Sequence, residues 1–246
     1  MRSEAASSFS RSRRDFLAWL TAVPLVTAGC AAEAHHEHHD EEPLPADPAQ
    51  GSAAPTEEAE AYEQEARVCR HTTRDAEGPY FASGSPVRSL RIAGLDEPGV
   101  RLLVEGRLFG PDCRTPLEGY ALDLWQADAS GDYFDGRASG YRLRGKVVTD
   151  RLGRYRFETI LPGRYGDAAG IRPAHIHAKV LTPRGGSLLT TQIYFEGDPH
   201  LGQADYCTRS RTCDSSDPAR ILRLFDATIA ATAGKRARFD VFTPRT

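Results

Sequence analysis

The sequence has no apolar run of the ~20 residues that a membrane-spanning helix needs, which excludes a polytopic membrane protein. The 22 glycines and 16 prolines follow no period, which excludes a collagen-like repeat. Clusters of basic and aromatic residues are also missing, so binding to nucleic acid is not expected. A hydrophobic content of 40% and a charged content of 26% are ordinary for a globular protein, which excludes disorder throughout.

Charge is distributed unevenly along the chain. Residues 1–30 carry four arginines and two acids, whereas residues 31–65 carry eleven acids and no lysine or arginine. The remaining residues, 66–246, carry 27 basic and 21 acidic side chains, a formal charge of +6. A mildly basic domain suits an anionic small molecule as its substrate. We therefore divide the chain into three parts, which are residues 1–30, residues 31–65 and a main domain over 66–246.

A basic region precedes an apolar stretch near the N-terminus. Arg13 and Arg14 stand before the apolar residues 16–29, which is the order of a secretory signal. Adjacent arginines followed by Phe-Leu resemble a twin-arginine export signal, and an ordinary export signal that contains Arg-Arg is the alternative. The pattern predicts a bacterial protein that is exported to the periplasm or to a membrane surface.

The apolar stretch ends with the sequence Thr-Ala-Gly before Cys30. This ending resembles a bacterial lipoprotein cleavage site, with Cys30 as the lipidated residue, and cleavage without lipidation is the alternative. One acylated cysteine would tether the protein to a membrane without spanning it.

Residues 31–65 show no apolar periodicity and cannot bury enough surface to offset the entropy of ordering. We interpret them as a disordered, flexible tether. The tether contains four closely spaced histidines, which are His35, His36, His38 and His39. They could capture a metal ion, and a low-complexity linker is the simpler interpretation.

Short β-type segments alternate with turns from residue 66 onward. The expected strands cover 101–109, 120–126, 145–149, 154–160, 175–181, 188–195 and 237–242. Only 218–230 is interpreted as a helix, because Asp217 can cap it and Pro218 suits the first helical position. The sum predicts an all-β domain, a β-sandwich with one late helix.

Four cysteines remain after Cys30, and they are Cys69, Cys113, Cys207 and Cys213. An even number in an exported domain predicts disulfides, with three possible pairings. The six-residue separation of Cys207 and Cys213 in a polar loop favours that pair, which leaves Cys69 with Cys113. A zinc site is the alternative, although the chain has no Cys-x-x-Cys motif.

The sharpest local motif is the segment 172–177, with the sequence RPAHIH. In a strand, residues two apart share a face, so His175 and His177 project together while Ile176 and Ala178 point into the core. Two imidazoles at this spacing can bind one metal ion. Alone, such a pair is more often a surface coincidence.

Two tyrosines stand where further ligands would be useful. Tyr133 follows a Gly-Asp turn, and Tyr165 follows the sequence LPGR just past an expected strand. Each alone is typical of a half-buried aromatic with a hydrogen-bonded hydroxyl. A ferric ion, however, binds phenolate strongly and can deprotonate tyrosine, so that two phenolates and two imidazoles would favour Fe(III).

Six segments in order resemble the intradiol ring-cleavage dioxygenases, above all the protocatechuate 3,4-dioxygenase type. They are EGPYF (77–81), LWQADASGDY (124–133), RGKVVTDRLGRYRF (144–157), LPGRY (161–165), RPAHIH (172–177) and TQIYFEGD (191–198). The resemblance runs from about Cys69 to Asp198. It implies one Fe(III) per chain, held by four ligands that are Tyr133, Tyr165, His175 and His177.

The resemblance also implies roles for other residues. Arg172 and Gln192 match the active-site arginine and its neighbouring glutamine, and Tyr165 matches the tyrosine that accepts a substrate proton. Pro79 and Tyr80 match a segment that lines the substrate pocket. The implied activity is cleavage of a catechol-type diol by O2 to a cis,cis-muconate-type diacid, in the catabolism of aromatic compounds.

Two features depart from the family pattern. Only nine residues separate Tyr165 from His175, fewer than in well-known cytoplasmic members, so the loop that caps the pocket is open to question. The helical dimerisation region of the catechol 1,2-dioxygenases has no counterpart in 31–65, which argues against that dimer and leaves a homo-oligomer of another kind open. The choice among catechol, protocatechuate, hydroxyquinol and larger diols is also open.

Two other functions compete with this one. An exported, non-catalytic β-module that binds a metal or a partner would explain the tether and the cysteines, but not the placement of Arg172 and Gln192. A zinc hydrolase that uses His175 and His177 lacks an obvious third ligand and a general-base carboxylate.

Overall fold

Strands dominate the computed structural model, which describes residues 69–167 and 170–245. These residues belong to one unit, Pro55–Thr246. The predicted signal segment, the tether with its histidines, and the lipidation site Cys30 lie outside the described residues. In the part of the chain that is described, no helix is long and apolar enough to cross a membrane.

One five-stranded sheet is built around its longest strand, β1 (Arg101–Phe109). That strand pairs in antiparallel with β4 (Arg154–Ile160) and in parallel with β11 (Thr232–Arg238). The end of β1 also pairs with β12 (Val241–Phe242), and β10 (Phe225–Ile229) pairs with β11 at the sheet edge. The sheet is therefore mixed rather than purely antiparallel.

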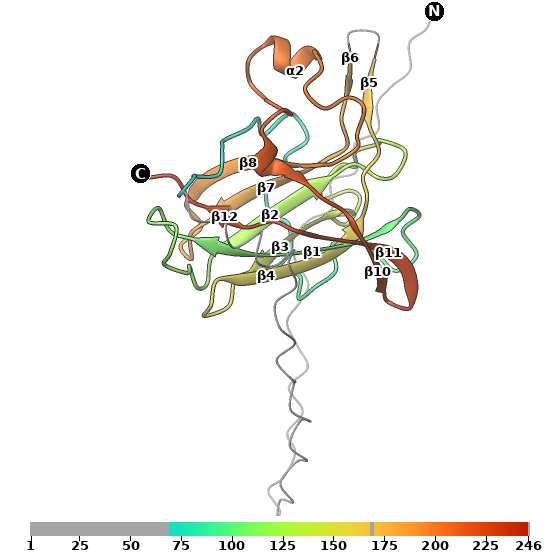
Figure 1. Ribbon diagram of the computed structural model, residues 1–246. Helices are drawn as coiled ribbons and strands as arrows, with labels where there is room; N and C mark the ends of the chain where they lie inside the picture. Colours follow the sequence, from blue (N-terminus) through green and yellow to red (C-terminus); the bar gives the residue numbers. More distant parts are fainter. Residues whose placement is uncertain (1–68, 168–169, 246) are drawn as a thin grey trace, which may run out of the picture. The chain divides into compact units, whose positions relative to one another are not determined.

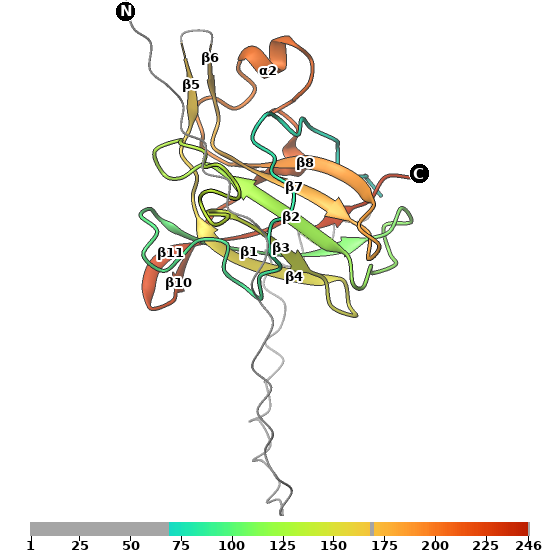
Figure 2. The ribbon, with the colours of Figure 1, turned by 180° about the vertical axis from the view of Figure 1, so that it is seen from behind.

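The second five-stranded sheet has the order β3-β2-β7-β8-β9. Its strands are β3 (Arg144–Val148), β2 (Ala121–Gln126), β7 (His175–Leu181), β8 (Ser187–Phe195) and β9 (Ile221–Leu222). A separate two-stranded ribbon, β5 (Tyr165–Asp167) and β6 (Gly170–Arg172), links the two sheets between β4 and β7. Figures 1 and 2 show this ribbon at the same end of the sandwich as the short helix α2 (Tyr206–Arg209).

The two large sheets pack face to face and enclose the apolar core (Figures 1 and 2). The core includes Leu102, Val104, Leu122, Leu124, Phe157, Ile176, Ala178, Val180, Ile193 and Val241. On β7, Ile176 and Ala178 belong to this core, as their alternation with the histidines predicts. Each large apolar side chain buried here stabilises the fold by about 1.5–3 kcal/mol. The predicted β-sandwich is confirmed.

The predicted late helix over 218–230 is wrong. Asp217 does cap a helical turn, since its carboxylate accepts the N–H of Ala219 at 3.1 Å, but the turn is the 3-10 segment η1 (Pro218–Arg220). The chain then extends into β9 and β10, because pairing with β8 and β11 outweighs local helix propensity. The β10–β11 turn has Ala230 and Ala231 at φ 48° and 63°, where Asn-Gly is usual, so the hairpin lacks its sequence signal.

Both disulfides have the pairing that the sequence favours. Cys207 pairs with Cys213, and Cys69 pairs with Cys113 across 44 residues. The Cys69–Cys113 bond fastens the segment before β1 to the loop between β1 and β2. His71 lies beside it, and its ring with the two sulfurs forms a group of metal-type donors within 4.8 Å of one another. The zinc alternative fails for these cysteines while their sulfurs are bonded to each other.

Candidate metal centre

The two tyrosine-bearing loops cross at one tight contact. Gly131 has φ 94°, and a Cβ at this position would overlap the carbonyl oxygen of Arg164. Glycine is therefore needed for the loops to meet. The contact brings Tyr133 and Tyr165 together, with ring centroids 5.3 Å apart and an interplanar angle of 88°.

The two histidines lie side by side on β7 and face away from the sandwich core. In register, His177 stands opposite Trp125 of β2 and Gln192 of β8, which places these side chains on one face of the sheet. The indole of Trp125 stacks on the His177 ring with 4.7 Å between centroids and an angle of 7°. The His175 and His177 rings are 4.9 Å apart and almost fully buried.

The four predicted ligand residues converge. The ring centroids of Tyr165 and His175 are 5.4 Å apart, and those of Tyr133 and His177 are 6.3 Å apart. The Oη atom of Tyr165 lies 3.5 Å from Nε2 of His175. Residues distant in sequence, from the β2–β3 loop, β5 and β7, therefore surround one point.

Hydrogen bonds orient the His175 ring, whereas the polar atoms of His177 and Tyr133 lack such partners among the described residues. The Nδ1–H of His175 donates to the carbonyl of Pro173 at 2.7 Å, which leaves the lone pair of Nε2 facing Tyr165. The ring nitrogens of His177 and the Oη of Tyr133 are buried and make no hydrogen bond of normal geometry within the described residues. Such groups usually have a partner. The two imidazoles and two phenols are therefore a donor set that fits a ferric ion.

The protein environment keeps His175, His177 and Tyr133 neutral in the absence of a cation. Burial, and then the charge of Arg172, lower the pKa of His175 to about 3. Burial and the neighbouring His175 hold the pKa of His177 well below its ordinary value. Burial and the nearby Tyr165 raise the pKa of Tyr133 well above 10. Neutral imidazoles are ready ligands, and a bound trivalent cation would favour the phenolate of Tyr133.

Arg172 ends β6 and points into the centre. Its side chain is 2% exposed. Its Nη1 donates to the Oη of Tyr165 at 3.2 Å and lies 3.3 Å from Nε2 of His175. Its Nη2 donates to Oε1 of Gln192 at 2.8 Å. The guanidinium therefore presents one nitrogen to the candidate metal ligands and the other to Gln192.

Gln192 is held by a fixed pattern of hydrogen bonds. Its Nε2 donates to the carbonyl of Ala76 at 2.7 Å, and its Oε1 accepts from Arg172 at 2.8 Å and lies 2.8 Å from the hydroxyl oxygen of Tyr194. The amide cannot turn over without losing these bonds. Gln192 and Arg172 thus lie together, as the resemblance implies.

Pro79 and Tyr80 lie at the rim of the centre. The Tyr80 ring stacks on Tyr133 with 4.1 Å between centroids and an angle of 6°, and its side chain is 40% exposed. Pro79 is also exposed. Both positions therefore suit contact with a molecule that enters from solvent.

Sequence reasoning missed several buried charges that hold the centre together. Arg144 donates to the carbonyls of Tyr80 (2.6 Å) and Phe134 (2.7 Å), which joins the rim segment to the loop that bears Tyr133. Arg220 is fully buried and pairs with Asp75, whose carboxylate also accepts the hydroxyl proton of Tyr194 at 3.0 Å. Arg144 is the first residue of the family-like segment 144–157, but the sequence does not reveal its hydrogen bonds to the carbonyls of Tyr80 and Phe134.

A carboxylate or thiol does not join His175 and His177 in a group of three metal-type donors within the described residues. A catalytic zinc site normally needs such a third protein ligand. The zinc hydrolase alternative therefore still lacks a third ligand among the described residues.

The family model described as Dioxygenase matches residues 76–240, which include every residue of the centre. The chain belongs to the intradiol ring-cleavage dioxygenase family. Catechol 1,2-dioxygenase 2 of Acinetobacter lwoffii is 36% identical to this family member over 163 residues, 59% of this chain and 58% of that protein. The protocatechuate 3,4-dioxygenase beta chain of Burkholderia cepacia is 37% identical over 116 residues, 42% of this chain and 48% of that protein.

Comparison with solved structures also finds dioxygenases similar to this chain. The dioxygenase domain of a dioxygenase carbohydrate-binding protein fusion from Streptomyces sp. SirexAA-E has a TM-score of 0.57 and 34% identity, and the match covers 72% of this chain and all of that chain. The 3-chlorocatechol 1,2-dioxygenase from Rhodococcus opacus 1CP has a TM-score of 0.61 and 26% identity, with 76% and 78% covered. This intradiol-family chain spans about half the length of the curated relatives it matches.

Proposed function

We propose that this intradiol-family protein cleaves the ring of a catechol-type diol between its two hydroxyl-bearing carbons, with O2 and one Fe(III) per chain. The product is a cis,cis-muconate-type diacid. One observation carries the proposal: Tyr133, Tyr165, His175 and His177 converge, and two of them bury donor atoms that make no normal hydrogen bond with the described residues. The names of the relatives, which act on catechols and protocatechuate, support the substrate class.

The proposed iron ligands divide into two pairs: Tyr165 and His175 contact Nη1 of Arg172, whereas Tyr133 and His177 make no hydrogen bond to it among the described residues. When bound, ferric iron supplies Lewis acidity that lowers the pKa of the diol and withdraws electron density from its ring. The Oη of Tyr165 receives a hydrogen bond from Arg172, which orients this oxygen. Held as a phenolate when iron is bound, Tyr165 would be the group that accepts a proton from the diol. Tyr133 is shielded from water by the stacked ring of Tyr80 and remains in place.

Arg172 stabilises the negative charge that develops on the substrate. Its guanidinium is oriented before the substrate arrives, because Gln192 holds Nη2 and the extended backbone before Pro173 directs the side chain inward. A preorganised donor of this kind contributes roughly 3–4 kcal/mol to the stabilisation of a transition state.

The test is oxygen uptake by the purified, ferric-loaded protein with catechol, protocatechuate and hydroxyquinol. We expect one O2 consumed per diol, a muconate-type absorbance, and both atoms of 18O2 in the product. Hydroquinone is the control, because its hydroxyls are not adjacent and it should not be cleaved. Absence of uptake with every adjacent diol, in protein that has bound iron, would refute the proposal and favour a non-catalytic β-module.

We also propose that the protein is exported, with residues 1–30 as its signal and Cys30 as a lipid anchor. The two disulfides support export, because such bonds persist mainly in oxidising compartments. Cell fractionation tests this: the wild type should be found with membranes, and Cys30→Ser should be released to the periplasmic fraction. Recovery of both forms in the cytosol would contradict it.

A further inference from the structure

The loop that follows β8 returns to the centre and places a carboxylate behind Arg172. Oδ2 of Asp205 lies 3.5 Å from Nε of Arg172, and both side chains are almost fully buried, at 1% and 2%. Among the described residues, neither of these two atoms makes a hydrogen bond within normal limits. A buried Nε–H and a buried carboxylate oxygen, each without another partner, therefore face each other.

The backbone of the loop fixes the direction of this carboxylate. Oδ1 of Asp205 accepts the N–H groups of Cys207 (2.7 Å) and Thr208 (2.8 Å), and Oγ1 of Thr208 accepts the N–H of Asp205 (2.8 Å). This reciprocal cap is a capping box at the start of α2. Because the cap uses Oδ1, Oδ2 is left to face the arginine.

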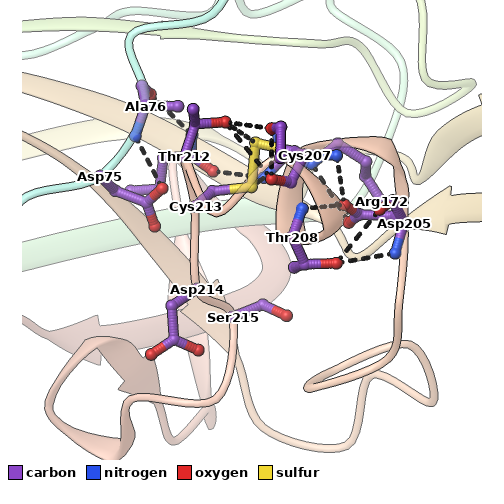
Figure 3. The surroundings of a disulfide bond; sticks show 12 residues. Asp75, Ala76, Arg172, Asp205, Cys207, Thr208, Thr212, Cys213, Asp214 and Ser215 are labelled. Carbon is purple, nitrogen blue, oxygen red and sulfur yellow. Dashed lines mark hydrogen bonds and ion pairs between the residues drawn. A yellow bond between two sulfur atoms is a disulfide. The ribbon is translucent and has the colours of Figure 1, made fainter.

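Two further contacts hold the loop against β6, the strand that carries Arg172. A Cβ on Gly170 would lie 2.8 Å from Cα of Asp205, so only glycine permits this approach. At the other end of the loop, Cys213 places its sulfur 3.4 Å from Nη2 of Arg172. Figure 3 shows Arg172 and Asp205 beside the Cys207–Cys213 bond.

We propose that Asp205 is a positioning residue that fixes the rotation of the Arg172 guanidinium. The planar group is then held on three sides: Nη2 by Gln192, Nε by Asp205, and Nη1 directed at the candidate metal ligands. Held at Nη2 alone, it could turn about that bond and withdraw Nη1. The consequence for turnover rests on the proposed function, whereas the pairing itself does not.

The pairing is tested in iron-free protein by the exchange rate of the Arg172 Nε–H, followed by NMR and assigned by its loss in Arg172→Lys. In Asp205→Asn, whose Oδ1 still caps α2, we expect exchange roughly tenfold faster, because the buried carboxylate that faces the Nε–H is replaced by a neutral amide. Asp205→Ser keeps a capping oxygen as well and serves if the amide variant does not fold.

Asp150→Asn is the matched control. Asp150 also caps a turn through Oδ1, which accepts the N–H groups of Leu152 and Arg154, and its Oδ2 pairs with the Arg154 side chain, 2.8 Å away. It lies in the β3–β4 turn, outside the centre. Exchange of the Arg172 signal should be unchanged in this variant. Equal rates in wild type and Asp205→Asn, or equal acceleration in Asp150→Asn, would overturn the proposal.

The second readout is turnover of ferric-loaded protein. In Asp205→Asn we expect kcat to fall about 10–100-fold, with little change in KM and an unchanged tyrosinate-to-iron absorption band. Loss of the band instead would mean that Asp205 acts through the ligands, which contradicts the positioning role. If the wild type cleaves no diol, the proposed function fails, and the exchange experiment still decides the pairing.

Discussion

The two halves of the candidate centre differ in how their polar atoms are satisfied. On one side, Arg172, Gln192 and Tyr194 form a closed set of hydrogen bonds. On the other side, the Oη of Tyr133 and the ring nitrogens of His177 are buried without a normal hydrogen bond to the described residues. The first group is thus joined internally by hydrogen bonds, apart from Nε of Arg172, whereas the second group is not. The difference separates the residues that we propose to orient Arg172 from those that we propose to bind the metal.

The largest expected effect comes from a change in the half that contains Tyr133 and His177. Tyr133→Phe removes a phenolic oxygen, so we expect much weaker iron binding and loss of the tyrosinate-to-iron colour contributed by this residue. Metal analysis and visible absorption measure both. Tyr141→Phe is the control, since that hydroxyl donates to the carbonyl of Ser83 and has no other hydrogen bond among the described residues. A visible spectrum that is unchanged in Tyr133→Phe would remove this residue from the ligand set.

A change in the half that contains Arg172, Gln192 and Tyr194 should lower turnover without loss of iron. Arg172→Leu is expected to retain iron and its colour while kcat falls about 10²–10³-fold, because a preorganised charge is lost without loss of a ligand. Arg154→Leu, which removes an exposed arginine paired with Asp150, should leave kcat unaltered. Normal turnover by iron-loaded Arg172→Leu would show that the Arg172 guanidinium is not needed for catalysis.

The smallest effect concerns stability against pH in iron-free protein. His175 has a native pKa of about 3, lowered mainly by burial, against about 6.5 in the unfolded chain. Between these values the unfolded state binds the extra proton, so the free energy of unfolding falls as the pH is lowered. His175 contributes about 1.4 kcal/mol per pH unit to this slope, and His177, whose pKa is also lowered, adds to it. Urea unfolding at several pH values measures this slope.

His175→Asn provides the comparison for that slope. The variant cannot take up the proton at this position, so its stability should depend less steeply on pH between about 6.5 and about 3. Identical slopes in variant and wild type would show that the burial of His175 does not govern acid sensitivity.

The residues of β7 explain why so much could be predicted from sequence. A period of two places His175 and His177 on one face and Ile176 and Ala178 on the other, and this local rule survives folding. The β10–β11 hairpin could not be found in this way, because its turn consists of two alanines in a conformation that glycine and asparagine usually adopt.

The pairing of buried charged residues is the second feature that could not be predicted from the sequence. Asp75 and Arg220 are 145 residues apart and meet only after the segment before β1 has folded across β8. A sequence shows which residues carry charge, but not which of them will lose contact with water and pair. Asp205 and Arg144 were missed for the same reason.

The crossing at Gly131 has a consequence for protein engineering. Because the backbone of one tyrosine loop lies directly against Arg164 of the other, a side chain at position 131 would displace the neighbouring loop. The conformations of the two loops therefore depend on each other. Transplanting substrate preference from a relative would therefore require both loops to be exchanged together, and libraries that randomise one alone would mostly sample misassembled sites.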